Sequence, residues 1–254
     1  MNHFVQLDSI TCIPFSQLGK GFEMIKKTKK PYIRDVYLAY LIDGANRTEP
    51  EGFPIIEEDM VTQKPPSDVI QWDRRKYDVV DASRTTICFY CNDVGFVPVL
   101  NNPEKYVKEL KKYESVIGPD ASPYDNMPLV VQNSQIYVNL AITYYLAKNG
   151  VKIIPNIRLG NGHTIASLKA YPTGTLIAIG THGFTRNPAN RHIFREQIEI
   201  IVKTLKPLGI VVYGPVNEYL FPKELIQNTP IYQFDSYTMK QNRIDRERRT
   251  NEGQ

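Results

Sequence analysis

The sequence has few cysteines and no long apolar run. Its 254 residues include 3 cysteines, and an odd, low count argues against a disulfide scaffold and suits a reducing compartment. No stretch approaches the roughly 20 apolar residues of a membrane span, so we expect no membrane partner or membrane segment. The first residues lack a basic stretch followed by an apolar core, so we expect no secretory signal peptide.

A strong excess of one charge is also missing. The chain has 31 Lys and Arg against 27 Asp and Glu, a formal net charge of +4. That balance permits a polyanionic partner without requiring one. The apolar share of 42% can build a sizeable core, which excludes wholesale disorder.

Two of the cysteines, Cys88 and Cys91, have the C-x-x-C spacing of redox and metal motifs. Both lie within an apparent strand, and no second pair completes a four-cysteine zinc site. We interpret them as reduced core residues that share no metal.

Three regions differ in their residue pattern. Residues 1–83 are expected to form an N-terminal arm or subdomain of uncertain structure. Within them, the Pro-, Glu- and Asp-rich stretch 47–73 is interpreted as a surface connection. Residues 84–238 are predicted to form an α/β core domain, and residues 239–254 a flexible charged tail.

Segments typical of strands and helices alternate throughout the predicted core domain. Apolar runs such as Lys152–Pro155 and Leu176–Gly180 are typical of buried parallel strands. The alternation predicts a mostly parallel sheet connected by right-handed crossovers. Polar residues end nearly every strand, which favours a TIM-barrel-like sheet, complete or partial. An open doubly wound sheet is the alternative.

Polar residues after the predicted strands are the candidate site, because ligands bind at the carboxyl ends of parallel strands. Arg158 is suited to clamp a phosphate or carboxylate, and His182 to act as a general acid or base. The alternative is that Asp and Asn after a strand only cap helices and form turns. The candidate catalytic residues are Asp120, Asn156 and His182, and the candidate substrate-binding residues are Ser122, Arg158, Thr181 and Asp235.

Two further features bear on ligands. Carboxylates that follow separate strands, namely Asp93, Asp120 and Asp235, could hold a divalent cation such as Mg²⁺ through oxygen ligands. The turn Gly180-Thr-His-Gly183 could present backbone amides to a ligand, but it matches neither a Walker A nor a dinucleotide motif. The basic stretch 242–249 contains two acids and is interpreted either as a nucleic-acid contact or as a solvated chain end.

Several short motifs occur in order across about residues 84–236. They are Gly118-Pro-Asp-Ala-Ser122, Tyr124-Asp-Asn-Met-Pro128, Gly150-Val-Lys-Ile-Ile-Pro-Asn156, Gly180-Thr-His-Gly183, Leu205-Lys-Pro207 and Val212-Tyr-Gly214. Together they resemble an uncharacterised domain-of-unknown-function family of phages, plasmids and other bacterial mobile elements. The sequence departs from that family at Gly118, where a serine is usual, and at Asn92, where a second acid beside Asp93 is usual. The resemblance implies a mobile-element origin and a bacterial host cytoplasm, and it implies no established activity.

Three functions remain open from the sequence. The preferred one is an enzyme acting on a phosphorylated or nucleotide-like substrate at the carboxyl ends of the strands. The alternatives are a nucleic-acid-binding protein that serves replication of the element, and a non-catalytic protein that sequesters a host factor or small molecule. Arg and Lys around the strand ends would favour a small anionic ligand, whereas a continuous basic stripe would favour nucleic acid. The sequence predicts no particular oligomeric state.

Overall fold

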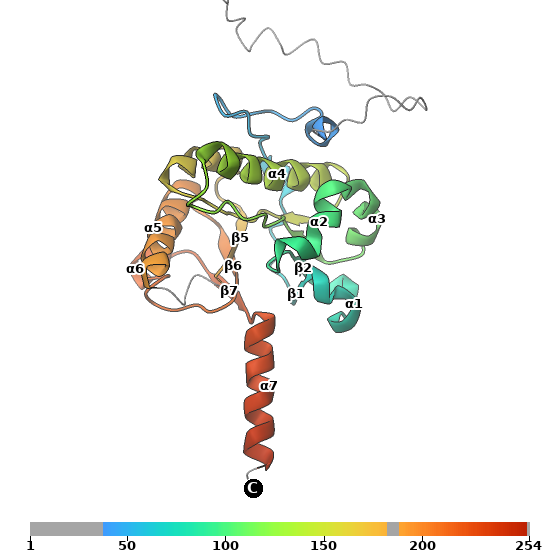
Figure 1. Cartoon of the computed structure of the whole chain (residues 1–254), viewed down its shortest axis with the longest axis vertical. Helices are drawn as coiled ribbons and strands as arrows, with labels where there is room; N and C mark the ends of the chain where they lie inside the picture. The colour runs from blue at the N-terminus through green and yellow to red at the C-terminus, as the bar shows by residue number, and fades with distance from the viewer. Residues whose placement is uncertain (1–37, 182–187, 253–254) are drawn as a thin grey trace, which may run out of the picture. The chain divides into compact units, whose positions relative to one another are not determined.

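The computed structural model describes residues 38–181 and 188–252 (Figure 1). The chain forms two compact units, Met1–Asp43 and Gly44–Gln254. The described part of the first unit contains a 3-10 helix at Ala39–Ile42. All the features below belong to the second unit.

The described residues of the second unit contain two parallel sheets. The first has the strand order β1 (Val69–Gln71), β2 (Thr86–Cys88), β3 (Ser115–Ile117) and β4 (Ile153–Ile154). The second has the order β5 (Leu176–Gly180), β6 (Gly209–Tyr213) and β7 (Ile231–Phe234). A single parallel bridge between Asn156 and Ala178 connects the end of β4 to β5. Spatial order therefore follows chain order from β1 to β7.

Helices connect and cover the strands. The longest are α4 (Leu129–Lys148) and α5 (Pro188–Leu205), and the shorter ones are α1 (Arg75–Asp78), α2 (Asp93–Asn101), α3 (Val107–Leu110) and α6 (Lys223–Ile226). In Figure 1, α4 lies above the strands, α5 to their left and α2 and α3 to their right. Helix α7 (Tyr237–Glu252) follows β7. Among the described residues, no helix has the length and apolar character needed to cross a membrane.

Each face of the strands packs into a different apolar cluster, because successive side chains of a strand point to opposite sides. Ile177 and Ile179 of β5 pack in the cluster that contains Leu140 of α4 and Ile198 of α5. The other face forms a cluster to which all seven strands or their ends contribute, consisting of Val69, Cys88, Tyr90, Ile117, Ile154, Leu176, Ala178, Val211 and Tyr213, with Tyr232 and Phe234 against it. The two sheets therefore share one apolar layer.

The predicted fold class is confirmed, since the sheets are parallel and alternate with helices. A complete barrel is not observed. The strands form separate sheets of four and three, and in the described part of the chain no pairing connects β7 to β1.

The stretch 47–73 is not the surface connection that its composition indicated. It contains β1, and Phe53, Ile56 and Val61 are 2%, 1% and 7% exposed. Its backbone is also tied to the core, because the N–H of Ile56 donates to the carbonyl of Ala170 at 2.8 Å. Prolines and acids in this stretch separate buried apolar residues, so average composition concealed a segment of the core.

The two cysteines of the C-x-x-C motif carry free thiols. Cys88 is completely buried in the shared apolar layer, as the core interpretation predicted. Burial raises the pKa of Cys88 well above the usual thiol value. Burial, with a further contribution from Asp73, raises the pKa of Cys91 to about 12. Neither thiol is therefore ionised at neutral pH, and a thiolate is the form that attacks disulfides or binds metals.

Candidate functional site

The segment after β3 places Asp120 in a buried polar network. Asp120 is 8% exposed, and its Oδ1 accepts a hydrogen bond from Asn156 Nδ2 at 2.8 Å. The same oxygen lies 3.7 Å from Nε of Arg158. Burial raises the pKa of Asp120, although Arg158 and Asn156 act to lower it and Asp93 raises it further. Three of the predicted site residues therefore meet at the carboxyl ends of β3 and β4.

Asn156 is the centre of this network. Besides bonding Asp120, its Nδ2 donates to the carbonyl of Pro119 at 2.9 Å, and its Oδ1 accepts from the hydroxyl of Tyr90 at 2.8 Å. Both halves of the amide are thus engaged, and the side chain is only 4% exposed. A buried amide with these partners has one favourable orientation, so Asn156 fixes the position of Asp120.

Tyr90 is the member of the network that sequence reasoning missed. Its ring stacks on Tyr213, with 5.6 Å between centroids and 18° between planes. On another side it contacts Gly180, where an added Cβ would lie 2.5 Å from the ring atom Cδ1. Gly180 therefore provides room for an aromatic ring. Tyr90 is the second residue after β2, and that position near a strand end is the signal that could have identified it.

The loop after Asp120 is held on two sides. Asn139 of α4 accepts a hydrogen bond from the N–H of Ala121 at 2.8 Å and donates to the carbonyl of the same residue at 2.9 Å. Ser122 donates to Asp93 through its N–H and its hydroxyl, each at 3.3 Å. The loop that carries Asp120 is thereby fixed to α4 and to the start of α2.

A cavity of about 270 Å³ lies beside the network. Arg158 and Ser122 line it, together with residues of the loop before α4 and of the first turns of α5, including Tyr124, Asn190, Ile193 and Phe194. The side chain of Arg158 is 17% exposed and contacts both the network and the cavity.

A larger hollow of about 750 Å³ is the weaker candidate for a site. It lies between α5 and α6 and is lined by Lys203, Pro207 and Thr229. Pro207 and Thr229 precede β6 and β7, so this hollow lies at the amino ends of the strands. The cations among its described lining residues are Arg195, Lys203 and Lys206; Lys203 is paired with Glu199 at 2.5 Å, and the guanidinium of Arg195 lies 5.1 Å from the centre of the Tyr219 ring. We therefore assign the candidate site to the smaller cavity at the carboxyl ends, where ligands bind in parallel α/β folds.

Other predicted site residues have local structural partners. Thr181 is completely buried, and its hydroxyl donates to the carbonyl of Pro215 at 2.9 Å. Asp235 accepts from Arg243 of α7 at 2.6 Å. Asn92, the position where the resembled family usually has a second acid, caps α2 by accepting from the N–H of Val94 at 3.2 Å. His182 and the rest of its glycine turn after Thr181 lie outside the described residues.

The predicted carboxylate cluster for a divalent cation does not form in the part of the chain that the structure describes. Across residues 38–181 and 188–252, no three His, Cys, Asp or Glu side chains are grouped as metal ligands. Asp93 instead contacts Ser122, Asp120 contacts Asn156, and Asp235 pairs with Arg243. In the described residues these three carboxylates therefore do not form one common donor set.

Comparison with known proteins gives a family and two phage relatives. Residues 49–235 match the family model described as Domain of unknown function (DUF4417). The chain is 23% identical to the Gene 1 protein of Mycobacterium phage L5 over 127 residues, which cover 50% of this chain and 56% of that relative. It is 20% identical to the Gene 1 protein of Mycobacterium phage D29 over 153 residues, or 59% of this chain and 56% of that relative. The match thus spans little more than half the length of either relative. No solved structure matches the chain.

Proposed function

The chain belongs to the family described as Domain of unknown function (DUF4417), and from this premise we propose that it is an enzyme acting on a small phosphorylated or nucleotide-like substrate. Membership confirms the resemblance predicted from the motifs. The family's description gives no activity, so the geometry of the site carries the proposal. Because the relatives are phage proteins, we infer a mobile-element origin and action in a bacterial host for this chain too.

The position of Arg158 is the observation that supports an anionic substrate. Its side chain lines the cavity, while its Nε faces the buried carboxylate of Asp120 at 3.7 Å. A guanidinium that is oriented by a carboxylate is pre-organised to bind a phosphate through two parallel N–H donors. Among the described residues that line the cavity, Arg158 is the only Lys or Arg. The acidic residue Asp125 is exposed, so solvent and salt screen its charge.

Asp120 is the group that we propose for proton transfer. The pKa of Asp120 is raised and therefore lies closer to neutral pH than the pKa of an ordinary aspartate, which suits a general acid or base. Asn156 would position this carboxyl, and Ser122 would contact the substrate from the cavity wall. When Arg158 binds a phosphate, its charge is partly compensated, and the pKa of Asp120 should rise further. Substrate binding would therefore favour protonation of Asp120.

Phosphate binding by the full chain tests the first step of this proposal. Ribose 5-phosphate and inorganic phosphate are titrated into the protein, and binding is followed by calorimetry or by NMR. Arg158→Ala should weaken both by ten-fold or more, because it removes the charged donor of the cavity. Arg84→Ala is the matched control, since Arg84 is exposed and does not line the cavity. Equal binding by Arg158→Ala and the unmodified chain would contradict the proposal.

Turnover tests the second step. A panel of phosphorylated substrates is assayed with Asp120→Asn, which removes the titratable group and keeps the shape of the side chain. Loss of turnover with retained phosphate binding is the expected result, and full turnover by the variant would exclude Asp120 as the acid–base group.

We also propose that the two sheets act as one partial, barrel-like layer. Support comes from the strand order, from the parallel bridge between Asn156 and Ala178, and from the apolar cluster to which every strand or its end contributes. This arrangement would bring the carboxyl ends of β2 to β5 to one edge. An experimental structure with the two sheets facing away from each other would overturn it.

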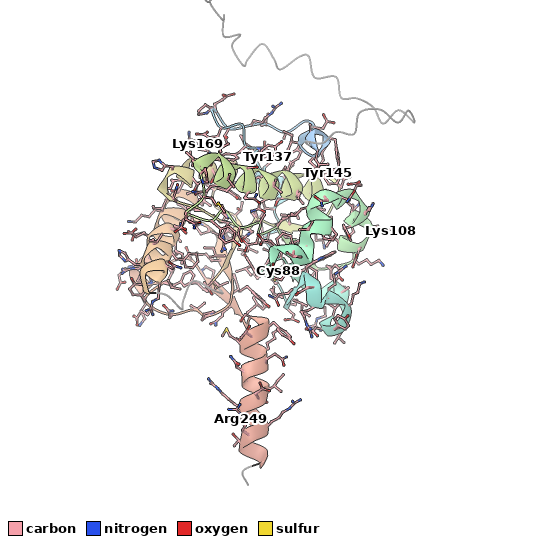
Figure 2. All side chains as sticks on the ribbon, in the orientation of Figure 1. Cys88, Lys108, Tyr137, Tyr145, Lys169 and Arg249 are labelled. Carbon is pink, nitrogen blue, oxygen red and sulfur yellow. The ribbon has the colours of Figure 1, made fainter. Side chains whose placement is uncertain are left out.

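Nucleic-acid binding is a second candidate, supported by α7. The tail expected from residue 239 is helical through Glu252, and side chains from Asn242 to Thr250 are exposed. Figure 2 labels Arg249 on α7. Arg243, Arg246 and Arg249 follow one another at intervals of three, so they lie on one side of the helix. Removing residues 242–254 should abolish salt-dependent binding to DNA while leaving phosphate binding intact.

A further inference from the structure

We propose that the ligand of the cavity is a nucleoside monophosphate, with its phosphate at Arg158 and its base against Tyr124 and Ile193. This inference rests on the proposed function and adds the chemical class of the substrate. Three observations support it: the apolar side chains that line the cavity, the hydrogen bonds of Gln132 to the backbone beside Tyr124, and the side-chain amides in the cavity wall.

Exposed apolar side chains lie at the mouth of the cavity and in the stretch next to it. Tyr124 and Ile193, which both line the cavity, are 59% and 42% exposed. Met127, Leu129 and Val130, in the same stretch as Tyr124, are 46%, 41% and 75% exposed. Apolar residues gathered at the edge of a pocket mark a binding surface. An apolar or aromatic part of the ligand is the occupant that this edge fits.

Gln132 holds this stretch in place. It is completely buried, and its Nε2 donates to the carbonyls of Asp125 at 3.2 Å and Met127 at 2.7 Å. Its Oε1 accepts from the N–H of Asn161 at 2.8 Å, and Asn161 follows Gly160 of the cavity wall. The residue before Asn161 is Gly160, and a Cβ there would lie 2.0 Å from the same oxygen. Gln132 thus connects the stretch that carries Tyr124 to the segment of Gly160 and Asn161. Because the backbone next to Tyr124 is held in this way, it would lose little entropy when a ligand stacks on the ring.

Polar groups beside these apolar side chains favour a nucleobase over a hydrocarbon chain. The amides of Asn190 and Gln197 line the cavity, and a side-chain amide can both donate to and accept from the edge of a base. Base stacking on an aromatic ring is tolerant of base identity and contributes substantially to nucleotide binding. Gln197 Nε2 already donates to the carbonyl of Gly160 at 2.6 Å, so the amide of Asn190 is the group for which a hydrocarbon chain would offer no hydrogen-bonding complement. A sugar phosphate would leave Tyr124 exposed.

The size of the cavity limits the ligand to one nucleotide. Its volume of about 270 Å³ lies just below the roughly 300–1,000 Å³ typical of pockets for drug-sized ligands. Arg158 is the only cation among the described lining residues, which suits one phosphate group better than a triphosphate. A monophosphate of a single nucleoside satisfies both limits.

The experiment compares ligands that share the phosphate but differ in the base. AMP, GMP, CMP and UMP are titrated into the full chain by calorimetry, with ribose 5-phosphate as the ligand that lacks a base. At least one monophosphate should bind ten-fold or more tightly than ribose 5-phosphate. Tyr124→Ala should remove that advantage without changing the affinity for ribose 5-phosphate, and Tyr124→Phe should retain it. Tyr77→Ala is the matched control, because Tyr77 is 78% exposed and does not line the cavity.

The two proposals fail in different ways. If ribose 5-phosphate and all four monophosphates bind equally through Arg158, the inference of a base is overturned and the proposed function stands. The inference is also overturned if Tyr124→Ala keeps the full advantage of the monophosphate. If no phosphorylated ligand binds at all, the proposed function fails as well, and the apolar edge is then to be tested as a protein-docking surface.

Discussion

Strand β3 carries a buried carboxylate at each end, and the two are held in opposite ways. Before the strand, Glu114 accepts hydrogen bonds from Lys64 Nζ at 2.6 Å, from the N–H of Ser67 at 2.7 Å and from its hydroxyl at 2.9 Å. After the strand, Asp120 meets the amide of Asn156 and, at the longer distance of 3.7 Å, the guanidinium of Arg158. The carboxylate of Glu114 is fully paired, whereas Arg158, the cation nearest to Asp120, also lines the cavity.

The pKa values follow from this difference. Burial acts to raise the pKa of Glu114, but the hydrogen bonds from Lys64 and Ser67 outweigh it and the pKa is lowered. Burial is the larger influence at Asp120, whose pKa is raised. In parallel α/β folds the amino ends of the strands serve stability and the carboxyl ends serve ligands. In this chain, the fully hydrogen-bonded Glu114 lies at the amino end of β3, where stability is served. Asp120, whose charge is less completely compensated, lies at the carboxyl end, where ligands bind.

Glu114→Ala should give the largest effect on stability. The substitution removes three hydrogen bonds of about 1 kcal/mol each, so the free energy of unfolding should fall by about 3 kcal/mol. Urea denaturation measures it, with the exposed Glu51 changed to Ala as a control. Phosphate binding by the folded fraction should stay unchanged. A variant with unaltered stability but weakened phosphate binding would reverse the roles that we assign to the two ends of β3.

Gly180→Ala tests whether the carboxyl end is as closely packed as the network requires. The new Cβ would lie 2.5 Å from the ring of Tyr90, which is itself stacked on Tyr213. Overpacking of this kind should lower the free energy of unfolding by about 2 kcal/mol. Gly162→Ala is the control, because nothing lies within 4 Å of the position of its Cβ, and a change of less than about 0.5 kcal/mol is expected there. Equal stabilities of the two variants would mean that Tyr90 is free to move.

The smallest effect, and the one that compares both ends directly, is the pH dependence of stability. Because the folded state raises the pKa of Asp120, this residue stabilises the fold most when protonated, and that contribution is lost as the pH rises through its folded pKa. Glu114 has the opposite sign: its contribution is present above the usual pKa of a glutamate and is lost as the pH falls through its lowered folded pKa.

Urea denaturation between about pH 3 and pH 7 separates the two carboxylates. The stability of the unmodified chain relative to Asp120→Asn should decrease as the pH rises. Relative to Glu114→Gln, it should increase. Slopes of the same sign for both comparisons would show that the two carboxylates are held alike.

Periodicity in the sequence was enough to predict part of this molecule. The apolar runs Lys152–Pro155 and Leu176–Gly180 identified the buried parallel strands β4 and β5, because this pattern follows from the repeat of one element. Composition failed between residues 47 and 73. There β1 is three residues long and the buried Phe53 and Ile56 stand among prolines and acids.

The candidate site shows the same division. Asp120, Asn156 and Arg158 were identified because each follows a predicted strand, and the structure brings them together. The same rule selected Thr181 and Asp235, whose side chains bond to Pro215 and Arg243. Position after a strand therefore identifies the edge where a residue lies, but it does not identify the neighbour that the residue contacts.

The sequence by itself determined the α/β class, the parallel strands and the family, since these depend on local patterns and on short motifs in order. Tertiary structure alone decided that Tyr90 bonds Asn156 across 66 positions of the chain, and that Gln132 connects the loop before α4 to Asn161. The physical reason is that burial and hydrogen bonding depend on which distant segments meet. A carboxyl group is a structural ion-pair partner at Glu114, beside Lys64, and a candidate acid–base group at Asp120, beside Arg158. The two roles differ because the charge of each carboxyl is compensated by neighbours that no local pattern specifies.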